Sequence, residues 1–339
     1  MSNDLAQRRK RKALTYFLIA GALTAVTAVT LGIEYRASRP DAVSGLVIPN
    51  LAESITAGQR IVIVSDEASY RIERAQQGDD AVWVMRDRGD YPVLASRLNQ
   101  LTEGLQTLRY TRRMTNDASK HERLGVGDPR QGGRGVLVQI EDSRGALLVN
   151  VILGVEPGAL YVRRPDEEQT WAAEGDLPPL RDIASWLDLR PIELEPEALA
   201  RVEVMPAEGR AYILARDAAG EPWRIAAPAL APLSQSVVRA TAERLATLEP
   251  RDVQPAPAIQ GPVRARIRAA TFDGVLIDAE IIEADQRLWV KLVARAGAPE
   301  QEQMALTLNN RAAPWAYGLS DLDAQQLAPT LAALLPGAN

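Results

Sequence analysis

The chain has 339 residues, of which 46% are hydrophobic, and it carries 39 lysine and arginine residues against 44 aspartate and glutamate residues. This length predicts two domains, and the hydrophobic content suffices for packed cores. The acidic balance argues against a nucleic-acid partner and against broad adhesion to anionic lipid, because both need a basic surface.

The first predicted element is a membrane helix over residues 13–33, an uncharged run that directly follows the basic residues 8–12. As a helix this run spans about 31 Å, enough to cross the hydrocarbon core of a bilayer. It is longer than the apolar part of a signal peptide, and Gly32 to Tyr35 make a poor cleavage site, so we expect an anchor that is retained. The basic residues precede the run, which predicts a cytoplasmic N-terminus and a periplasmic bulk in a bacterial inner-membrane protein. The absence of cysteine is compatible with that location.

Two later stretches repeat one pattern when Trp83 is aligned with Trp223. In each copy, two short alternating strands and a third strand with the tryptophan precede a helix. Alternation in the first two strands involves Ile61, Ile63, Tyr70 and Ile72 in the first copy, and Val202, Val204, Tyr212 and Leu214 in the second. The helix stripes are Leu98, Leu101, Leu105 and Leu108, and then Val238, Thr241, Leu245 and Leu248.

Three more strands are predicted after the helix of each copy. They cover residues 135–142, 146–154 and 160–165 in the first copy, and residues 263–272, 275–282 and 287–294 in the second. The chain is then expected to close with a helix, a Trp-Tyr loop at Trp315 to Tyr317, and an amphipathic helix. The apolar positions of that last helix are Leu327, Leu331, Leu334 and Leu335.

The predicted fold class is therefore α+β: an N-terminal transmembrane helix followed by two tandem modules, each an antiparallel sheet covered by one main helix. The predicted boundaries are a cytoplasmic tail (1–12), the transmembrane helix (13–33), a juxtamembrane linker (34–59), the first module (60–173), a linker (174–198), the second module (199–297) and a C-terminal helical segment (298–339).

No catalytic residue, cofactor site or metal site is predicted. The single histidine, His121, has no second histidine and no cysteine to complete a metal site, and nothing suggests a Ser-His-Asp arrangement. We expect it to be exposed on a helix. The glycine-rich residues 124–135 match neither a P-loop nor a dinucleotide-binding fingerprint, and they precede a strand rather than a helix.

Five arginines are the candidate partner contacts. Arg264, Arg266 and Arg268 alternate along one strand and therefore share a face, which either binds an anionic partner or is a solvated face paired with the next strand. A three-residue loop, 272–274, would place Arg268 opposite Asp278 and Arg266 opposite Glu280.

The other two candidates, Arg163 and Arg164, precede the acidic residues 166–168 at the tip of an expected hairpin. That tip is either a partner contact or a solvated turn.

An ordered series of motifs gives the chain a family resemblance. It comprises Trp83, Tyr91-Pro92, the leucine-striped helix, Leu-Gly-x-x-x-Pro from Leu124, Tyr161-Val162-Arg163 and Trp186-Leu187-Asp188. From about residue 60 to residue 320, the chain resembles the bacterial domain-of-unknown-function family numbered 4340. The resemblance implies a single N-terminal anchor, an external repeat domain and genes that often neighbour ABC-type transport or gliding-motility auxiliary components. The family offers no established catalytic residues to carry over.

These features favour a membrane-anchored periplasmic binding or assembly protein without enzymatic activity. Its expected partners are the inner membrane, through the anchor, and an ABC-type permease or another envelope protein. A structural tether without a ligand is one alternative. An envelope hydrolase that uses Asp or Glu is another, and it would require two carboxylates converging in a cleft.

Overall fold

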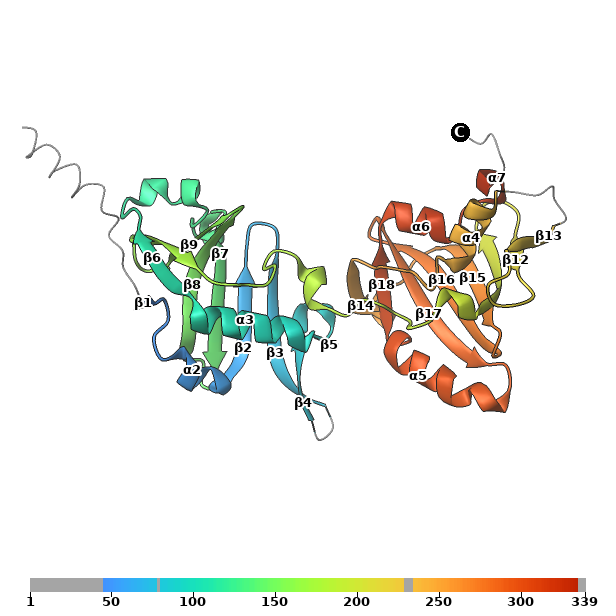
Figure 1. Cartoon of the computed structure of the whole chain (residues 1–339), viewed down its shortest axis with the longest axis horizontal. Helices are drawn as coiled ribbons and strands as arrows, with labels where there is room; N and C mark the ends of the chain where they lie inside the picture. The colour runs from blue at the N-terminus through green and yellow to red at the C-terminus, as the bar shows by residue number, and fades with distance from the viewer. Residues whose placement is uncertain (1–44, 78–79, 229–233, 335–339) are drawn as a thin grey trace, which may run out of the picture.

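The computed structural model describes residues 45–77, 80–228 and 234–334, and these residues form an α+β fold with two antiparallel sheets of ten and eight strands. The predicted membrane helix over 13–33 lies outside the described residues. Among the described helices, none is both long and apolar enough to cross a membrane. The two sheets lie side by side along the long axis of the molecule (Figure 1).

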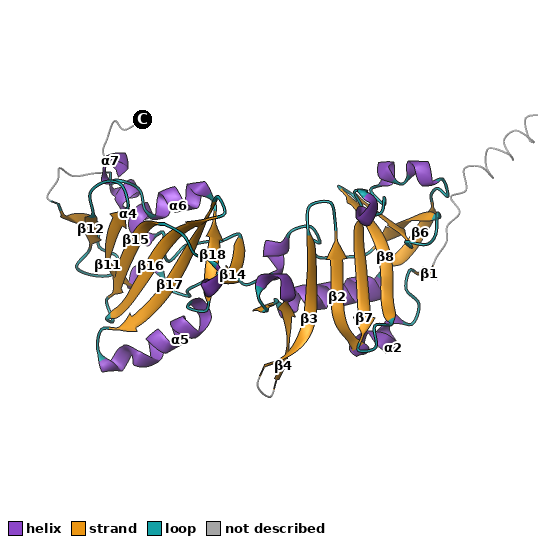
Figure 2. Cartoon of the chain, turned by 180° about the vertical axis from the view of Figure 1, so that it is seen from behind, coloured by secondary structure: helices purple, strands orange, loops and turns teal. Residues whose placement is uncertain are grey.

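The first sheet has the strand order β1-β6-β10-β9-β8-β7-β2-β3-β4-β5. Helix α3 (Ala95–Thr107) lies across one face of this sheet, and α2 (Leu51–Ser54) lies beside the same face. Figure 2 shows β2, β3 and β7 in front of α3. The strands are β1 (Gly45–Leu46), β2 (Gly58–Val64), β3 (Ser69–Gln77), β4 (Asp80–Met85), β5 (Tyr91–Pro92), β6 (Arg109–Arg113), β7 (Val136–Asp142), β8 (Leu147–Glu156), β9 (Ala159–Arg163) and β10 (Thr170–Glu174). The expected linker over 34–59 thus contains β1, α2 and the start of β2.

The second sheet has the order β13-β12-β11-β15-β16-β17-β18-β14. Its strands are β11 (Leu199–Pro206), β12 (Tyr212–Ala215), β13 (Arg224–Ala227), β14 (Asp252–Pro255), β15 (Val263–Thr271), β16 (Val275–Ala284), β17 (Arg287–Ala296) and β18 (Trp315–Leu319). The accompanying helices are α4 (Gln235–Glu243), α5 (Glu302–Ala312), α6 (Asp321–Leu327) and α7 (Leu331–Leu334).

The two sheets share one topology. Eight strands of the first sheet, in the order β4-β3-β2-β7-β8-β9-β10-β6, correspond one by one to the whole of the second sheet. The first sheet adds only β1 and β5, one at each edge. The sequence repeat is therefore a repeat of an eight-stranded antiparallel sheet.

The predicted Trp-Tyr loop at Trp315 is wrong, because these residues form β18, which fills the place between β17 and β14. Its counterpart in the first sheet is β10, and both strands contain Trp-Ala, at Trp171-Ala172 and at Trp315-Ala316. The single amphipathic helix predicted after it is also wrong, because the chain forms two short helices, α6 and α7, there.

Helix α3 packs on the first sheet through the predicted stripe, since Leu98, Leu101, Leu105 and Leu108 are all buried. In the second module, Val238 and Thr241 on α4 are buried, and Leu245 and Leu248 continue the buried stripe beyond the end of that helix. The prediction of one main helix per module does not hold for the second module. Helix α5 also packs there, and Asn309 on it both donates to and accepts from the backbone of Ala294 in β17.

A buried tyrosine in each module holds the segment that follows its sheet. The Tyr70 hydroxyl donates to the Leu180 carbonyl at 2.8 Å, and the Tyr212 hydroxyl donates to the Pro329 carbonyl at 2.9 Å. The indole N–H of Trp186 donates to the Pro179 carbonyl at 3.0 Å. The proline-rich segment after β10 is therefore packed onto the first module.

Helix α3 carries a glycine where that segment passes over it. A Cβ atom on Gly104 would lie 2.1 Å from the Asp176 carbonyl oxygen and 2.9 Å from a Leu177 methyl group. Glycine is therefore needed at this position for close backbone approach, although a glycine inside a helix normally lowers the stability of that helix.

Gly104→Ala is consequently expected to lower the free energy of unfolding by about 1–3 kcal/mol, through overpacking. In a helix with free space around the glycine, the same change would raise the free energy of unfolding by about 1 kcal/mol. Chemical denaturation of the full chain measures the difference, with Glu103→Ala on the exposed side of α3 as the control. Stabilisation by Gly104→Ala would contradict the close approach.

The two modules meet end to end through an aromatic contact surrounded by ion pairs. Tyr91 in β5 contacts Trp315 and Tyr317 in β18 with edge-to-face geometry, at ring-centre distances of 4.8 and 6.5 Å. Arg88, just before β5, donates to Asp252 in β14 at 2.6 Å.

A second set of contacts closes the joint on the side of α5. The guanidinium group of Arg311 donates to Asp188 at 2.6 Å and to Glu193 at 2.8 Å. Most of the buried apolar side chains of both modules belong to one continuous hydrophobic cluster. The joint is thus a packed interface between the modules.

Candidate partner interface

The open face of the second sheet carries three of the five predicted arginine contacts. Arg264, Arg266 and Arg268 point away from the core, because Ala265, Ile267 and Ala269 between them are buried. The strand register is the predicted one: Arg266 lies opposite Glu280 and Arg268 lies opposite Asp278. The three-residue loop 272–274 that sets this register is also confirmed, with Gly274 at a φ of 90°.

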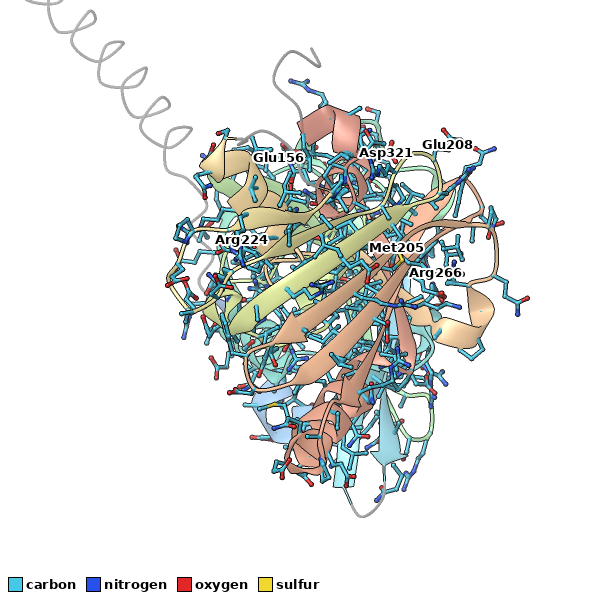
Figure 3. The ribbon with its side chains drawn as sticks, turned by 90° about the vertical axis from the view of Figure 1, so that its right-hand side faces the viewer. Glu156, Met205, Glu208, Arg224, Arg266 and Asp321 are labelled. Atoms are coloured by element: carbon cyan, nitrogen blue, oxygen red, sulfur yellow. The ribbon has the colours of Figure 1, made fainter. Side chains whose placement is uncertain are left out.

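Neighbouring strands extend this charged surface beyond β15. We call it the arginine face and define it by the cations Arg201, Arg266, Arg268, Lys291 and Arg295 and the carboxylates Glu203, Asp278 and Glu280. Figure 3 looks onto these strands and labels Met205 and Arg266 on them. At one end of this side, the 3-10 turn Ala256–Ala258 leads into Ile259, which packs on Ile282 in β16 and Trp289 in β17. In the described part of the chain, no α-helix lies over the charged part of this side. Cations outnumber carboxylates here, although the whole chain has a formal charge of −5.

Most of the charges on the arginine face are paired at the surface. Glu280 accepts from Arg266 at 2.9 Å, and Asp278 is shared between Arg268, at 3.3 Å, and Arg295. At the margin of the face, Arg264 donates to Glu283 at 2.6 Å. Such exposed pairs each contribute about 0–1 kcal/mol, so an incoming carboxylate can replace one at little cost.

The arginine face also has apolar contact area and a hollow. Leu276 and Val293 are 41% and 46% exposed between the charged side chains. A depression of about 410 Å³ is lined by Arg266, Asp278, Lys291 and Val293, among others. A surface of this kind fits a protein partner with acidic side chains better than it fits a small molecule, because it is shallow and mostly charged.

The other two candidate arginines lie apart from the arginine face and differ from each other. Arg163 is only 6% exposed, and its guanidinium group donates to the carbonyls of Val126, Arg164, Pro165 and Glu167, each at 3.1 Å. Burial lowers the pKa of Arg163. This side chain therefore organises the turn after β9, and its surface for a partner is minimal.

Arg164 is 47% exposed in its side chain and lies 3.8 Å from a carboxylate oxygen of Glu167. Its guanidinium group thus remains accessible to a partner.

The expectation of an exposed, helical His121 is wrong. It is 7% exposed, it lies between two 3-10 turns, and its Nε2 contacts the Glu168 carbonyl at 2.8 Å. The loop that carries it folds onto the second face of the first sheet, where Val126 packs against Leu137 and Ile152. A Cβ atom on Gly154 in β8 would lie 2.2 Å from the Leu124 carbonyl oxygen, which shows how closely the loop approaches.

The same loop brings three features together that the sequence treats separately. His121, the glycine-rich residues around Gly127 and Gly133, and Arg163 line one cleft of about 350 Å³. The rim of this cleft also holds Glu122, Asp128 and residues 166–168. Arg163 and His121 already bond to backbone carbonyls. We therefore interpret the cleft as the inner side of a folded loop and not as a reactive centre.

Five carboxyl groups of the described chain have a lowered pKa. A hydrogen bond from Arg86 lowers the pKa of Glu73, and a hydrogen bond from Arg130 lowers the pKa of Asp128. The pKa values of Asp117, Asp142 and Asp323 are lowered as well. A general acid in glycoside hydrolysis needs a raised pKa. Within the described residues, no group of three or more His, Cys, Asp or Glu side chains is placed to hold a metal ion.

Comparison with known families gives one match. The model for the domain of unknown function DUF4340 covers residues 83–260, just over half of the chain. The chain belongs to the DUF4340 family. No curated protein and no solved structure matches it.

The DUF4340 match does not coincide with one sheet. It begins at Trp83 in β4 and ends after β14, so it includes parts of both modules and only one side of the joint between them, because Trp315, Tyr317 and Arg311 lie beyond it. Arg163, Arg164 and Arg201 lie inside the match, whereas Arg266 and Arg268 lie beyond it. Arg201, Lys291 and Arg295 were absent from the predicted contacts, although the alternation of their strands would have placed them on the same face.

Proposed function

We propose that this DUF4340 protein is a membrane-anchored binding or assembly protein of the bacterial periplasm, and that its arginine face holds an acidic region of a partner protein. Residues 13–33 anchor it in the inner membrane with the N-terminus in the cytoplasm. The partner is a component of an ABC-type transport complex or another envelope complex, which is the class that the family resemblance implies. The protein contributes binding and position, and no chemical step.

The observation that carries the proposal is the uncovered cationic face on an otherwise acidic chain. A four-stranded antiparallel face with its charges in exposed pairs is rigid and exchanges those pairs cheaply. The excess of cations steers an acidic surface toward it. Leu276 and Val293 supply apolar contact once the partner is in place.

The two alternative functions, hydrolase and tether, require different structural features. A hydrolase needs a carboxyl group with a raised pKa in a cleft, and the lowered pKa values of Glu73 and Asp128 do not suit these two groups to that role. A simple tether needs no particular surface on the second module. It therefore predicts that changes on the arginine face leave the interaction partners unchanged.

The test is in-cell crosslinking of the tagged full chain, followed by membrane solubilisation and mass spectrometry. For Arg266→Glu with Arg268→Glu, we expect recovery of the envelope partner to fall by roughly tenfold or more, because like charges then face each other. Arg60→Glu with Arg71→Glu, two ion-paired arginines that share the open face of the first sheet, is the matched control, and it should leave recovery unchanged. Equal recovery from all three proteins would favour the tether, and recovery of no partner at all would remove the assembly role.

A further inference from the structure

The strand next to the far edge of the first sheet is unusually basic, and only the two-residue β1 lies outside it. β6 has the sequence Arg109-Tyr110-Thr111-Arg112-Arg113, and its three arginines are exposed. We call these three arginines the basic edge. None of them forms an ion pair with another described residue, and Arg113 donates instead to the neutral side chain of Gln169 at 2.7 Å. The basic edge is therefore uncompensated positive charge on an acidic chain, apart from Glu174, which faces Arg109 across the strand pair.

Aromatic rings and a fourth arginine lie beside the basic edge. The rings of Tyr110 and Trp171 are 4.9 Å apart, and the Arg113 guanidinium lies 6.0 Å from the Trp171 ring. Burial raises the pKa of the Tyr110 hydroxyl, and the neighbouring charge of Arg164 acts in the opposite direction. Half-buried Tyr and Trp next to Arg is the combination found at the boundary between water and lipid headgroups.

The position of β6 in the chain places it near the predicted anchor. β1 pairs directly with β6, with Gly45 opposite Tyr110 and Leu46 opposite Arg109. Only residues 34–44 separate β1 from the end of the predicted span, and such a segment reaches at most about 40 Å. β6 and β1 also lie at the end of the first sheet that is farthest from the second module (Figure 1).

We propose that the basic edge binds the phosphate groups of anionic lipids in the membrane that holds the anchor, so that the first module rests on the bilayer. This inference rests on the anchor in the proposed function. Guanidinium groups bind phosphate oxygens through paired N–H donors, and each basic residue near an anionic surface strengthens binding roughly fivefold. The overall acidity of the chain confines the contact to this one edge. The second module and its arginine face are then held away from the membrane.

The test uses the full chain in lipid nanodiscs and a single fluorescent label. Because the chain has no cysteine, Thr111→Cys on β6 gives one labelling site within the basic edge. Val293→Cys on the second module is the control site. Nanodiscs of phosphatidylcholine alone are compared with nanodiscs that also contain phosphatidylglycerol, and the quencher is a spin-labelled lipid near the headgroups.

We expect severalfold stronger quenching at position 111 than at position 293 in the anionic nanodiscs. The quenching at position 111 should weaken in nanodiscs of phosphatidylcholine alone, at high salt, and when Arg109, Arg112 and Arg113 are changed to Gln. Changing Arg264, Arg266 and Arg268 to Gln should leave the quenching at position 111 unchanged. The salt series is measured on the labelled chain without any arginine substitution, so it does not depend on how well a variant folds. Three outcomes would each overturn the inference: equal quenching in both lipids, absence of quenching at position 111, or burial of the label only when a partner protein is added. Failure of the full chain to enter nanodiscs would instead contradict the anchor, and both proposals with it.

Discussion

Arg163→Met is expected to lower the free energy of unfolding of the chain by about 3 kcal/mol. The substitution keeps the apolar length of the side chain but removes the donors that satisfy four backbone carbonyls, among them those of Val126 and Glu167. Each buried carbonyl without a donor costs about 1–3 kcal/mol, and water entering the cleft recovers part of that cost. Chemical denaturation of the full chain measures the loss.

Arg164→Met is the matched control one residue away. Arg164 is half exposed, with a 3.8 Å ion pair to Glu167 and a hydrogen bond to Tyr110, so its loss should cost less than about 1 kcal/mol. Equal losses for the two variants would contradict the assignment of Arg163 to the interior. If both variants keep their stability, the four carbonyl contacts are not formed in solution.

Asp252→Asn is expected to weaken the joint between the modules by about 2 kcal/mol. Asp252 accepts from Arg88 of the first module at 2.6 Å and from Arg287 of the second at 2.9 Å, and its side chain is 10% exposed. Breaking a fully buried pair costs about 3–5 kcal/mol. Half-exposed Arg287 can regain water, so the expected cost here is smaller.

The readout for Asp252→Asn is denaturant unfolding together with hydrogen exchange of the amides in β5 and β14. Exchange should rise in both strands, because they carry the contact between the modules. Asp217→Asn, which breaks an exposed pair with Arg224, is the control and should change stability by less than about 1 kcal/mol. A loss that appears only in the second module would show that Asp252 stabilises β14 and not the joint.

Much of the fold follows from short-range patterns. Alternation places Ile61, Ile63, Val202 and Val204 in the core, and the three-residue loop before Val275 fixes the register of Arg266 against Glu280. Such positions are predictable because a strand has a period of two and a short loop permits few registers. β18 escaped prediction because it is a short strand that ends in Gly318-Leu319, between two helices.

The buried His121 and Arg163 depend on contacts that local sequence does not encode. Arg163 is held by backbone carbonyls, which every residue possesses, so no residue type marks its partners. For His121 a signal did exist. Val136, Leu137 and Val138 form a continuous buried run, as do Val151, Ile152 and Leu153. Continuous apolar strands indicate a sheet covered on both faces, and the loop around His121 is the cover.

The most direct test of the central claim, that the arginine face binds an envelope partner, is photocrosslinking from position 293 in living cells. Val293 lies within that face and is 46% exposed, whereas Met304 on α5 is 55% exposed on another side of the same module. A photoreactive residue at position 293 is expected to yield a crosslink to a subunit of an envelope complex, and one at position 304 is expected to yield none. Crosslinks of equal yield from both positions, or a product from position 304 alone, would contradict the claim.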